Sequence, residues 1–493
     1  MAELRPIEEE EEEQPELVEE EEEQHDLIVV DNEFIENLLN GIKSSNPLSL
    51  AQAVDIILGI FGYKNAVALD DDLSENPTLS ILTNLIPKLV EIYDSSKEGS
   101  VKKQKVTDLL EKLAAAIFDS FDKFKKEKPL FKIFCNALGT MIQHADPDVY
   151  KKAFTNATKV GLLKQSYNNI IFKLFEKTVL EEQLQSMTIR NIYLQLSSYA
   201  NANLVESLLP RVADFYIQFN EQSCPFIKNL IQKLAAETID ALQQTSKTFI
   251  SWSLYTTVEL ITSYIIGTQD RRFIHPFITT VLPLLKNFPI KLYLPFQIRI
   301  CLLIHTISQE FDVFVPLLSW MAEAIQFVCT VSCKGDVKFK WNDEILSPQT
   351  FSVEFCHEAL ERIKKLFFSH LMLQGTSIAF PEFIHSIRVK LESVLHSQQK
   401  NQIANELRPL IKIITKQQQA LLEIKRGLNW EQRNEQLANW KREIALVDLP
   451  LQSFVNREAK VEETLKQMNA TKTEKPLEEY KDDELTVATV DDV

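Results

Sequence analysis

The sequence predicts an all-α protein, a HEAT- or armadillo-like α-solenoid with disordered acidic tails at both ends. Apolar residues recur at spacings of three and four almost without a break from Phe34 to about residue 425, which is the period of amphipathic helices. Only 10 of the 493 residues are glycine, so few tight turns are expected. The length exceeds the roughly 250–300 residues at which a single core stops growing, which favours stacked helices over one globular bundle.

Short breaks between the predicted helices carry turn and helix-starting residues. They lie at Asn46-Pro47, Asp146-Pro147, Gly267–Asp270 and Asn287–Pro289. Asp146-Pro147 is typical of a helix start, with Asp as the N-cap and Pro in the first turn. The one weak strand signal is the alternating stretch from Asp336 to Trp341.

The charge is concentrated at the two ends of the chain. Residues 1–24 contain 13 Glu and one Arg, and residues 471–493 contain eight acidic residues and three Lys. These segments account for the whole net charge of −17, so the residues between them are neutral. Blocks of like charge cannot bury enough area to offset the entropy of ordering, so both tails are predicted to be disordered. The N-terminal tail is then either a solubiliser or an arm for basic partners.

Five segments are predicted along the chain. They are an acidic tail (1–26), N-terminal helical repeats (27–250), core helical repeats (251–425), a C-terminal docking segment (426–465) and a second acidic tail (466–493). Trp430 and Trp440 are candidates for docking the fourth segment on the helical body.

The six cysteines are scattered through apolar helical patterns, which indicates free thiols in a reducing compartment. No apolar run reaches about 18 residues without a charge or Pro, so no membrane-spanning helix is expected. Cys329, Cys333, Cys356 and His357 would formally supply four zinc ligands, but the usual two-residue spacing is missing and a plain core is favoured. No metal or cofactor is therefore predicted.

Patterns that carry catalysis are missing from the sequence. No glycine pair has the spacing of a phosphate-binding loop, which argues against the nucleotide enzymes that use one. His275, His305 and His385 are single histidines in apolar helical contexts, where core packing is the favoured role. No Ser–His–Asp set can be assembled, so no catalytic residue is predicted.

Lysines Lys123, Lys125, Lys126, Lys128 and Lys132 alternate with Phe121, Phe124 and Phe131. Such a cluster is able to meet the phosphates of ribosomal RNA. The alternative is a solvated helix end, and this alternative is favoured.

Several short motifs occur in order between Trp252 and Leu451. Tyr293–Leu318 contains Pro295, and the step Phe314-Val315-Pro316-Leu317 leads into the next helix. Ser377–Glu382 has the sequence SIAFPE and contains Phe380, Pro381 and Glu382. Trp440 and Leu449-Pro450-Leu451 follow. By these motifs the chain resembles the nucleolar complex protein two family, which usually has arginine where this chain has Gln297 and Leu302, on either side of Arg299.

The resemblance implies a non-catalytic scaffold in the nucleolus and nucleus, acting in assembly of the large ribosomal subunit. It implies binding to nucleolar complex proteins one and three on the pre-ribosomal particle, and a role in maturation and export of the precursor. A HEAT-type transport or cargo adaptor is the alternative, and an enzyme with an unrecognised site is a third reading.

The motif residues themselves are predicted to be structural. Pro295, Pro316 and Pro381 are placed at helix starts, where Pro is tolerated in the first turn. Phe314 and Phe380 are predicted to anchor adjacent helices against each other, with Phe380 buried between its own helix and the preceding one.

Overall fold

The computed structural model describes most of the chain between the two acidic tails. The described residues are 28–62, 67–69, 77–97, 100–126, 128–141, 147–244, 249–335, 338–398, 402–427, 433–447 and 449–454. The predicted tails lie outside them, as does Trp430. Apart from two short strands, the regular structure of the described residues is helical, which confirms the all-α prediction. The chain divides into two compact units, Met1–Asn191 and Ile192–Val493.

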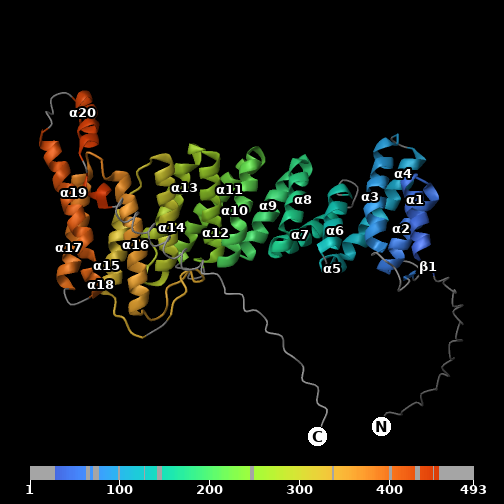
Figure 1. Cartoon of the computed structure of the whole chain (residues 1–493), viewed down its shortest axis with the longest axis horizontal. Coiled ribbons are helices and arrows are strands. Elements are labelled where there is room, and N and C mark those ends of the chain that lie inside the picture. The colour runs from blue at the N-terminus through green and yellow to red at the C-terminus, as the bar shows by residue number, and fades with distance from the viewer. Residues whose placement is uncertain are drawn as a thin grey trace, which may run out of the picture. The chain divides into compact units, whose positions relative to one another are not determined.

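The first unit consists of short helices around an apolar core (Figure 1). Its helices are α1 (Asn32–Lys43), α2 (Pro47–Phe61), α3 (Pro77–Ser95), α4 (Val101–Asp119), α5 (Phe121–Phe124), α6 (Lys128–Met141), α7 (Pro147–Leu163), the 3-10 helix η1 (Gln165–Tyr167), α8 (Asn168–Leu180) and the start of α9 (Glu182–Ser198). The strands β1 (Ile28–Val30) and β2 (Val67–Leu69) also belong to this unit.

The strand prediction was wrong in its location. Of the predicted stretch Asp336–Trp341, the described residues 338–341 form no strand. The strands lie instead at β1 and β2, which pair in parallel with Ile28 opposite Val67. Each has only three residues, too short for a period of two to stand out in the sequence.

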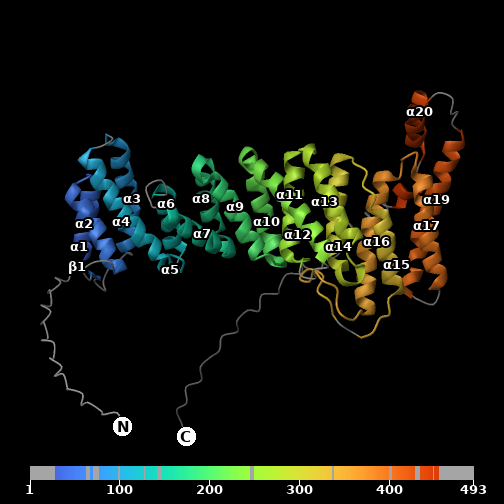
Figure 2. The same cartoon turned by 180° about the vertical axis from the view of Figure 1, so that it is seen from behind.

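The second unit is a succession of helices in which neighbours along the chain lie side by side (Figures 1 and 2). Its elements after α9 are α10 (Ala202–Gln218), α11 (Asn220–Gln244), α12 (Trp252–Thr268), the 3-10 helix η2 (Arg271–Phe273), α13 (Ile274–Lys286), α14 (Ile290–Phe311), α15 (Leu318–Thr330), α16 (Val353–Gln374), α17 (Phe380–Ser397), α18 (Gln402–Asn405), α19 (Leu407–Gly427) and α20 (Arg433–Leu446). The even-numbered helices α10, α12, α14 and α16 each pack against the next, and α15, α17 and α19 do the same.

Local sequence explains where several helices begin and end. Asn46 caps α2 with its side chain, which accepts from the Leu48 N–H at 3.1 Å, and Pro47 follows in the first turn. Ser251 and Ser352 cap α12 and α16 in the same way. Gln269 ends α12 in the left-handed conformation. The predicted break at Asn287–Pro289 lies between α13 and α14, the break at Asn46-Pro47 marks the start of α2, and the break at Gly267–Asp270 includes the end of α12.

Among the described residues, α14 alone is long and apolar enough to cross a membrane by length and composition. However, 61% of its apolar window is buried within the protein. Phe296, Ile300, Cys301 and Ile304 have no exposed surface. One face of α14 is therefore packed in the core, while residues such as Leu292 and Leu302 on the helix are exposed.

The boundary between the units falls within α9, whereas the predicted boundary lay at residue 250. The structural division follows the packing of the chain, whereas the predicted boundary followed the sequence motifs. The five predicted segments remain a prediction.

Candidate protein-binding site at the start of α17

The SIAFPE motif forms the turn between α16 and the start of α17. The Phe380 N–H donates to the Ser377 carbonyl at 3.0 Å, and the Phe380 side chain has no exposed surface. Pro381 lies in the first turn of α17, where its missing N–H removes no helical hydrogen bond. The turn is thus closed by its own backbone and anchored in the core by one ring.

Two buried glutamines of α19 form hydrogen bonds to the backbone of this turn. The Gln417 side-chain amide donates to the Gly375 carbonyl at 2.7 Å, and that of Gln418 donates to the Pro381 carbonyl at 2.7 Å. The Gln417 side-chain oxygen also accepts from the Leu451 N–H at 3.2 Å. Each bond pairs a buried backbone group that would otherwise be costly to desolvate. Neither glutamine was predicted from the sequence, although both interrupt the apolar stripe of α19.

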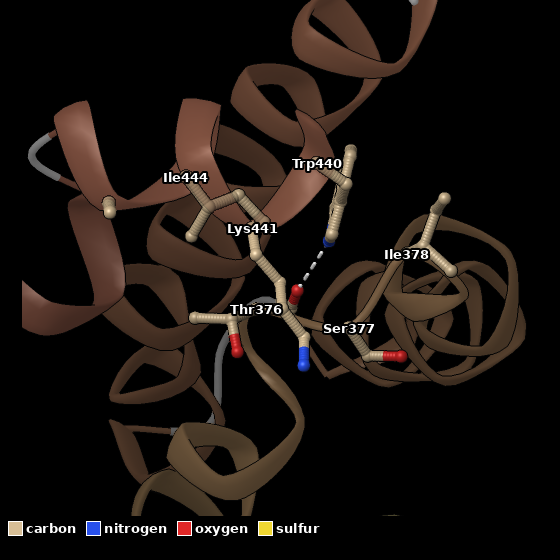
Figure 3. A pocket seen from close by; sticks show the side chains of 7 residues that line it. Thr376, Ser377, Ile378, Trp440, Lys441 and Ile444 are labelled. Carbon is tan, nitrogen blue, oxygen red and sulfur yellow. Dashed lines mark hydrogen bonds between the residues drawn. The ribbon is translucent and has the colours of Figure 1, made fainter. Parts of the chain in front are cut away.

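Two further motif residues, Trp440 and Glu382, contact the same turn. The Trp440 indole on α20 donates to the Thr376 carbonyl at 2.9 Å, as Figure 3 shows. Glu382 forms an ion pair with Lys425 of α19, whose ammonium also donates to the Ile378 carbonyl at 3.3 Å. The structure therefore brings Phe380, Pro381, Glu382 and Trp440 together. Trp440 thus links α20 to this turn, and the C-terminal docking segment of residues 426–465 stays a prediction.

A mostly apolar groove opens between this turn and α20. Figure 3 shows side chains of both elements around it. The groove has a volume of about 420 Å³ and is lined by Thr376, Ser377, Ile378, Trp440, Lys441, Ile444 and Ala445. At the end of α20, Leu446 is 77% exposed, and Val447, the next residue, is also exposed. Apolar surface of this kind in a groove is typical of contact with another protein.

The second motif lies between α14 and α15. Tyr293 has non-helical backbone angles, so α14 is kinked there and Pro295 begins the straight part. Pro316 lies two residues before α15. Phe314 differs from the prediction, because it is 56% exposed and the buried side chains of this step are Val315 and Leu317. Its ring still contacts Phe383 of α17, with centroids 6.3 Å apart.

A buried histidine pair supports the same connection. The His370 Nε2–H donates to the Val315 carbonyl at 3.0 Å, because a carbonyl only accepts. His370 Nδ1 then accepts from His305 Nδ1–H at 3.3 Å, and His305 Nε2 accepts from the Ser369 hydroxyl at 2.7 Å. Burial lowers the pKa of His370 to about 4, with a further contribution from His305, and burial also lowers the pKa of His305.

The prediction of core packing is wrong for the other two histidines. His275 and His385 are exposed on α13 and α17, so of the three predicted core histidines only His305 is buried. Both correspond to polar positions of helices whose other residues are apolar, which the local pattern did not resolve.

Gln297, at a position where the resembling family has arginine, is fully buried. Its amide nitrogen donates to the carbonyls of Leu284, Leu285 and Phe288, at 3.1, 3.2 and 2.9 Å. Leu284 and Leu285 lie in the last turn of α13, where carbonyls lack helical partners, and Phe288 follows the helix. Leu302 is exposed. Arg299 lies over the Trp252 ring at 5.0 Å and donates to the Asn342 carbonyl at 3.1 Å.

The candidate zinc ligands are only partly brought together. Cys333 and Cys356 have their sulfurs 3.6 Å apart, whereas His357 instead pairs with Glu406 at 3.2 Å. No set of three or more donors placed to hold a metal occurs among the described residues.

The predicted RNA contact lies in the first unit, around the end of α5. Lys126 and Lys128 are exposed, whereas Lys125 forms an ion pair with Asp122 and so lowers the pKa of that carboxyl. The Lys164 ammonium donates to the Lys125 carbonyl at 2.7 Å, which adds a further positive charge. The side chain of Lys123 lies outside the described residues. Phe124 and Phe131 are buried in the core, so neither is available to stack on a base.

Comparison with known proteins gives one family. The profile of the Noc2p family matches residues 182–458, just over half of the chain. This stretch contains every motif described above, from Pro295 to Leu451. No curated protein matches the chain.

Proposed function

Because the chain belongs to the Noc2p family, we propose that it acts as a non-catalytic scaffold that holds partner proteins on the large-subunit pre-ribosome. The coarse role follows from the family, which serves ribosome biogenesis in the nucleolus. The scaffold mechanism, the partners and a role in nuclear export are the finer parts of the proposal.

The arrangement of the motif residues is the observation that carries this proposal. Gln417, Gln418 and Trp440 bind backbone carbonyls of the turn, and Phe380 fills the core beneath it. Their polar groups are satisfied by the protein itself, which is the behaviour of residues that fix a shape. The shape that they fix is the wall of an apolar groove.

Partner binding in this groove is the most specific form of the proposal. Ile444 and Ala445 line the groove, and Leu446 and Val447, which follow them in the chain, are exposed. Apolar side chains gathered in a groove are suited to an apolar anchor of a partner. Nucleolar complex proteins one and three are the proposed partners, on early and later particles respectively.

The HEAT- or armadillo-like architecture is also proposed. It is supported by packing in the second unit, where α10, α12, α14 and α16 follow one another and α15, α17 and α19 do likewise. In a solenoid each repeat contacts only its neighbours, and an extended surface is left for partners.

The experiment is affinity capture of the full chain from nuclear extract, followed by mass spectrometry. Ala445→Arg places a long charged side chain in the groove, and Ala236→Arg makes the same change at an exposed position of α11. We expect Ala236→Arg to recover the other nucleolar complex proteins normally and Ala445→Arg to recover about tenfold less, a loss of about 1.4 kcal/mol in binding.

Equal recovery by both variants would contradict partner binding in the groove. Recovery of transport receptors in place of ribosome assembly factors would favour the alternative, a HEAT-type transport or cargo adaptor. The melting temperatures of both variants serve as the control for folding.

Contact with ribosomal RNA is a separate proposal, supported by the exposed Lys126 and Lys128 beside Lys164. Phosphate contacts make binding salt-dependent, with one unit of slope lost for about each contact removed. Lys126→Ala/Lys128→Ala should therefore lower RNA affinity and flatten its salt dependence. An unchanged slope would assign these lysines to a solvated helix end.

A further inference from the structure

Two cysteine thiols away from the groove lie in contact with each other. Cys333 follows α15 in the connection to α16, and Cys356 lies in the first turn of α16. Their Sγ atoms are 3.6 Å apart, and both are free thiols. A disulfide needs about 2.05 Å between the sulfurs, so the atoms have to approach by about 1.5 Å.

The connection is able to supply this movement. Cys356 is held in a helix that Ser352 caps, and its side chain is fully buried. Cys333 lies in non-helical backbone and is half-buried. The Lys334 N–H donates to the Phe351 carbonyl at 2.8 Å, which holds the two segments together close to both thiols.

We propose that Cys333 and Cys356 are a modification site at which a hydroperoxide converts the two thiols into an intramolecular disulfide. The Cys333 sulfur attacks the peroxide oxygen, the O–O bond breaks, and Cys333 becomes a sulfenic acid while the hydroxide or alkoxide leaves with the thiol proton. The Cys356 sulfur then displaces the sulfenic oxygen as water and forms the S–S bond. The peroxide is the two-electron oxidant, and the two thiols are oxidised.

The surroundings of the two sulfurs assign these roles. Cys333 is accessible to solvent, whereas burial raises the pKa of the Cys356 thiol, and the adjacent Cys333 raises it further. A buried thiol of raised pKa is a poor first nucleophile toward peroxide. It needs only to react with a sulfenic acid already in contact with it.

The disulfide would restrain the connection between α15 and α16. This connection lies along α14, the helix that contains Pro295. The Phe296 N–H donates to the Ile345 carbonyl at 3.1 Å, and the Ser347 N–H donates to the Leu292 carbonyl at 2.9 Å. Leu292 and Phe296 flank the kink and Pro295. A disulfide closes the loop from Cys333 to Cys356, and this restrains both the unfolded chain and the connection itself.

A third thiol makes the pairing testable. Cys329 is fully buried on α15, and its charge contributes to raising the pKa of Cys356, so it lies close to the pair. Cys333 is the assigned partner because its sulfur is in contact with that of Cys356 and because Cys333 is more accessible than Cys329.

The test treats the reduced full chain with hydrogen peroxide, blocks remaining thiols with N-ethylmaleimide and measures the intact mass. We expect loss of two hydrogens and protection of two of the six thiols, reversed by dithiothreitol. Cys329→Ala should still form the bridge, and Cys333→Ser should not. Fragment ions of the cross-linked peptides from the unmutated chain locate the bridge even if a variant folds poorly.

The bridged protein should also resist thermolysin between residues 338 and 351 by about tenfold, because the ends of the connection are joined. Six reactive thiols after peroxide treatment would overturn the proposal. So would a bridge that survives Cys333→Ser, addition of oxygen atoms without loss of hydrogen, or disulfide-linked dimers on a non-reducing gel.

Discussion

The connection between α14 and α15 and the turn between α16 and α17 both carry a phenylalanine close to a proline. In the turn, Phe380 is the first residue of a helix and is completely buried. In the connection, Phe314 lies in non-helical backbone and is 56% exposed. The Leu317 N–H donates to the Val315 carbonyl at 2.9 Å in a tight turn, in which Val315 and Leu317 are buried while Phe314 and Pro316 are exposed. The same residue types therefore serve opposite purposes, according to the backbone that carries them.

The two regions also differ in what holds their backbone. Amide side chains of Gln417 and Gln418 bind the carbonyls of the turn, and these groups do not titrate. The imidazole of His370 binds the Val315 carbonyl of the connection, and an imidazole does titrate. Acid should therefore loosen the connection at the bond from His370, whereas the hydrogen bonds from Gln417 and Gln418 to the turn should not respond to acid.

Phe380→Ala should give the largest loss of stability. Removing a fully buried ring costs about 3–5 kcal/mol, through lost burial and the cavity left behind. The measurement is urea denaturation of the full chain, followed by tryptophan fluorescence. A loss below about 1 kcal/mol would mean that the turn collapses around the missing ring and that Phe380 is not its anchor.

Gln417→Leu should come next. It leaves the Gly375 carbonyl and the Leu451 N–H without their partner, and each buried group left unpaired costs about 1–3 kcal/mol. Gln419→Leu is the matched control, because Gln419 is exposed on the same helix. Equal effects of the two substitutions in urea denaturation would contradict the role given to Gln417.

Acid should destabilise the connection through the histidine pair. The pKa of His370 is about 4 in the folded protein, below that of an unfolded histidine, which is about 6.5. The unfolded state therefore binds more protons between these values. Stability is fully present above about pH 6.5 and falls by up to about 1.4 kcal/mol per pH unit toward pH 4.

Urea denaturation of His370→Gln at pH 7 and pH 5 tests this dependence on acid. The difference between the two pH values should be smaller in this variant than in the unmutated chain. His385→Gln, at an exposed site on α17, should keep the full difference. An unchanged difference in His370→Gln would assign the acid sensitivity to other groups.

Phe314→Ala should have the smallest effect, below about 1 kcal/mol, because more than half of the side chain is already in water. The stability of this variant beside that of Phe380→Ala measures the contrast between the two regions directly. Similar losses from both substitutions would remove the contrast.

The sequence predicted the features that depend on local pattern. Helical spacing, the break at Asn46-Pro47 and the proline at the start of α17 are short-range signals, and the structure contains all of them. Features set by distant partners were missed. Gln417 and Gln418 act on a turn about 40 residues away in sequence, and His305 meets His370 across 65 residues. The exposure of Phe314 depended on whether its segment was helical or non-helical, which three- and four-residue spacings do not decide.

The most direct test of the account is to measure stability and partner recovery together for Phe380→Ala. The central claim is that Phe380 shapes the surface from the core and does not itself contact partners. The account predicts that recovery of nucleolar complex proteins falls only as far as the fraction of folded protein falls, and returns at a lower temperature where the variant is folded. Loss of binding by a variant that keeps its full stability would make Phe380 a contact residue and contradict the claim.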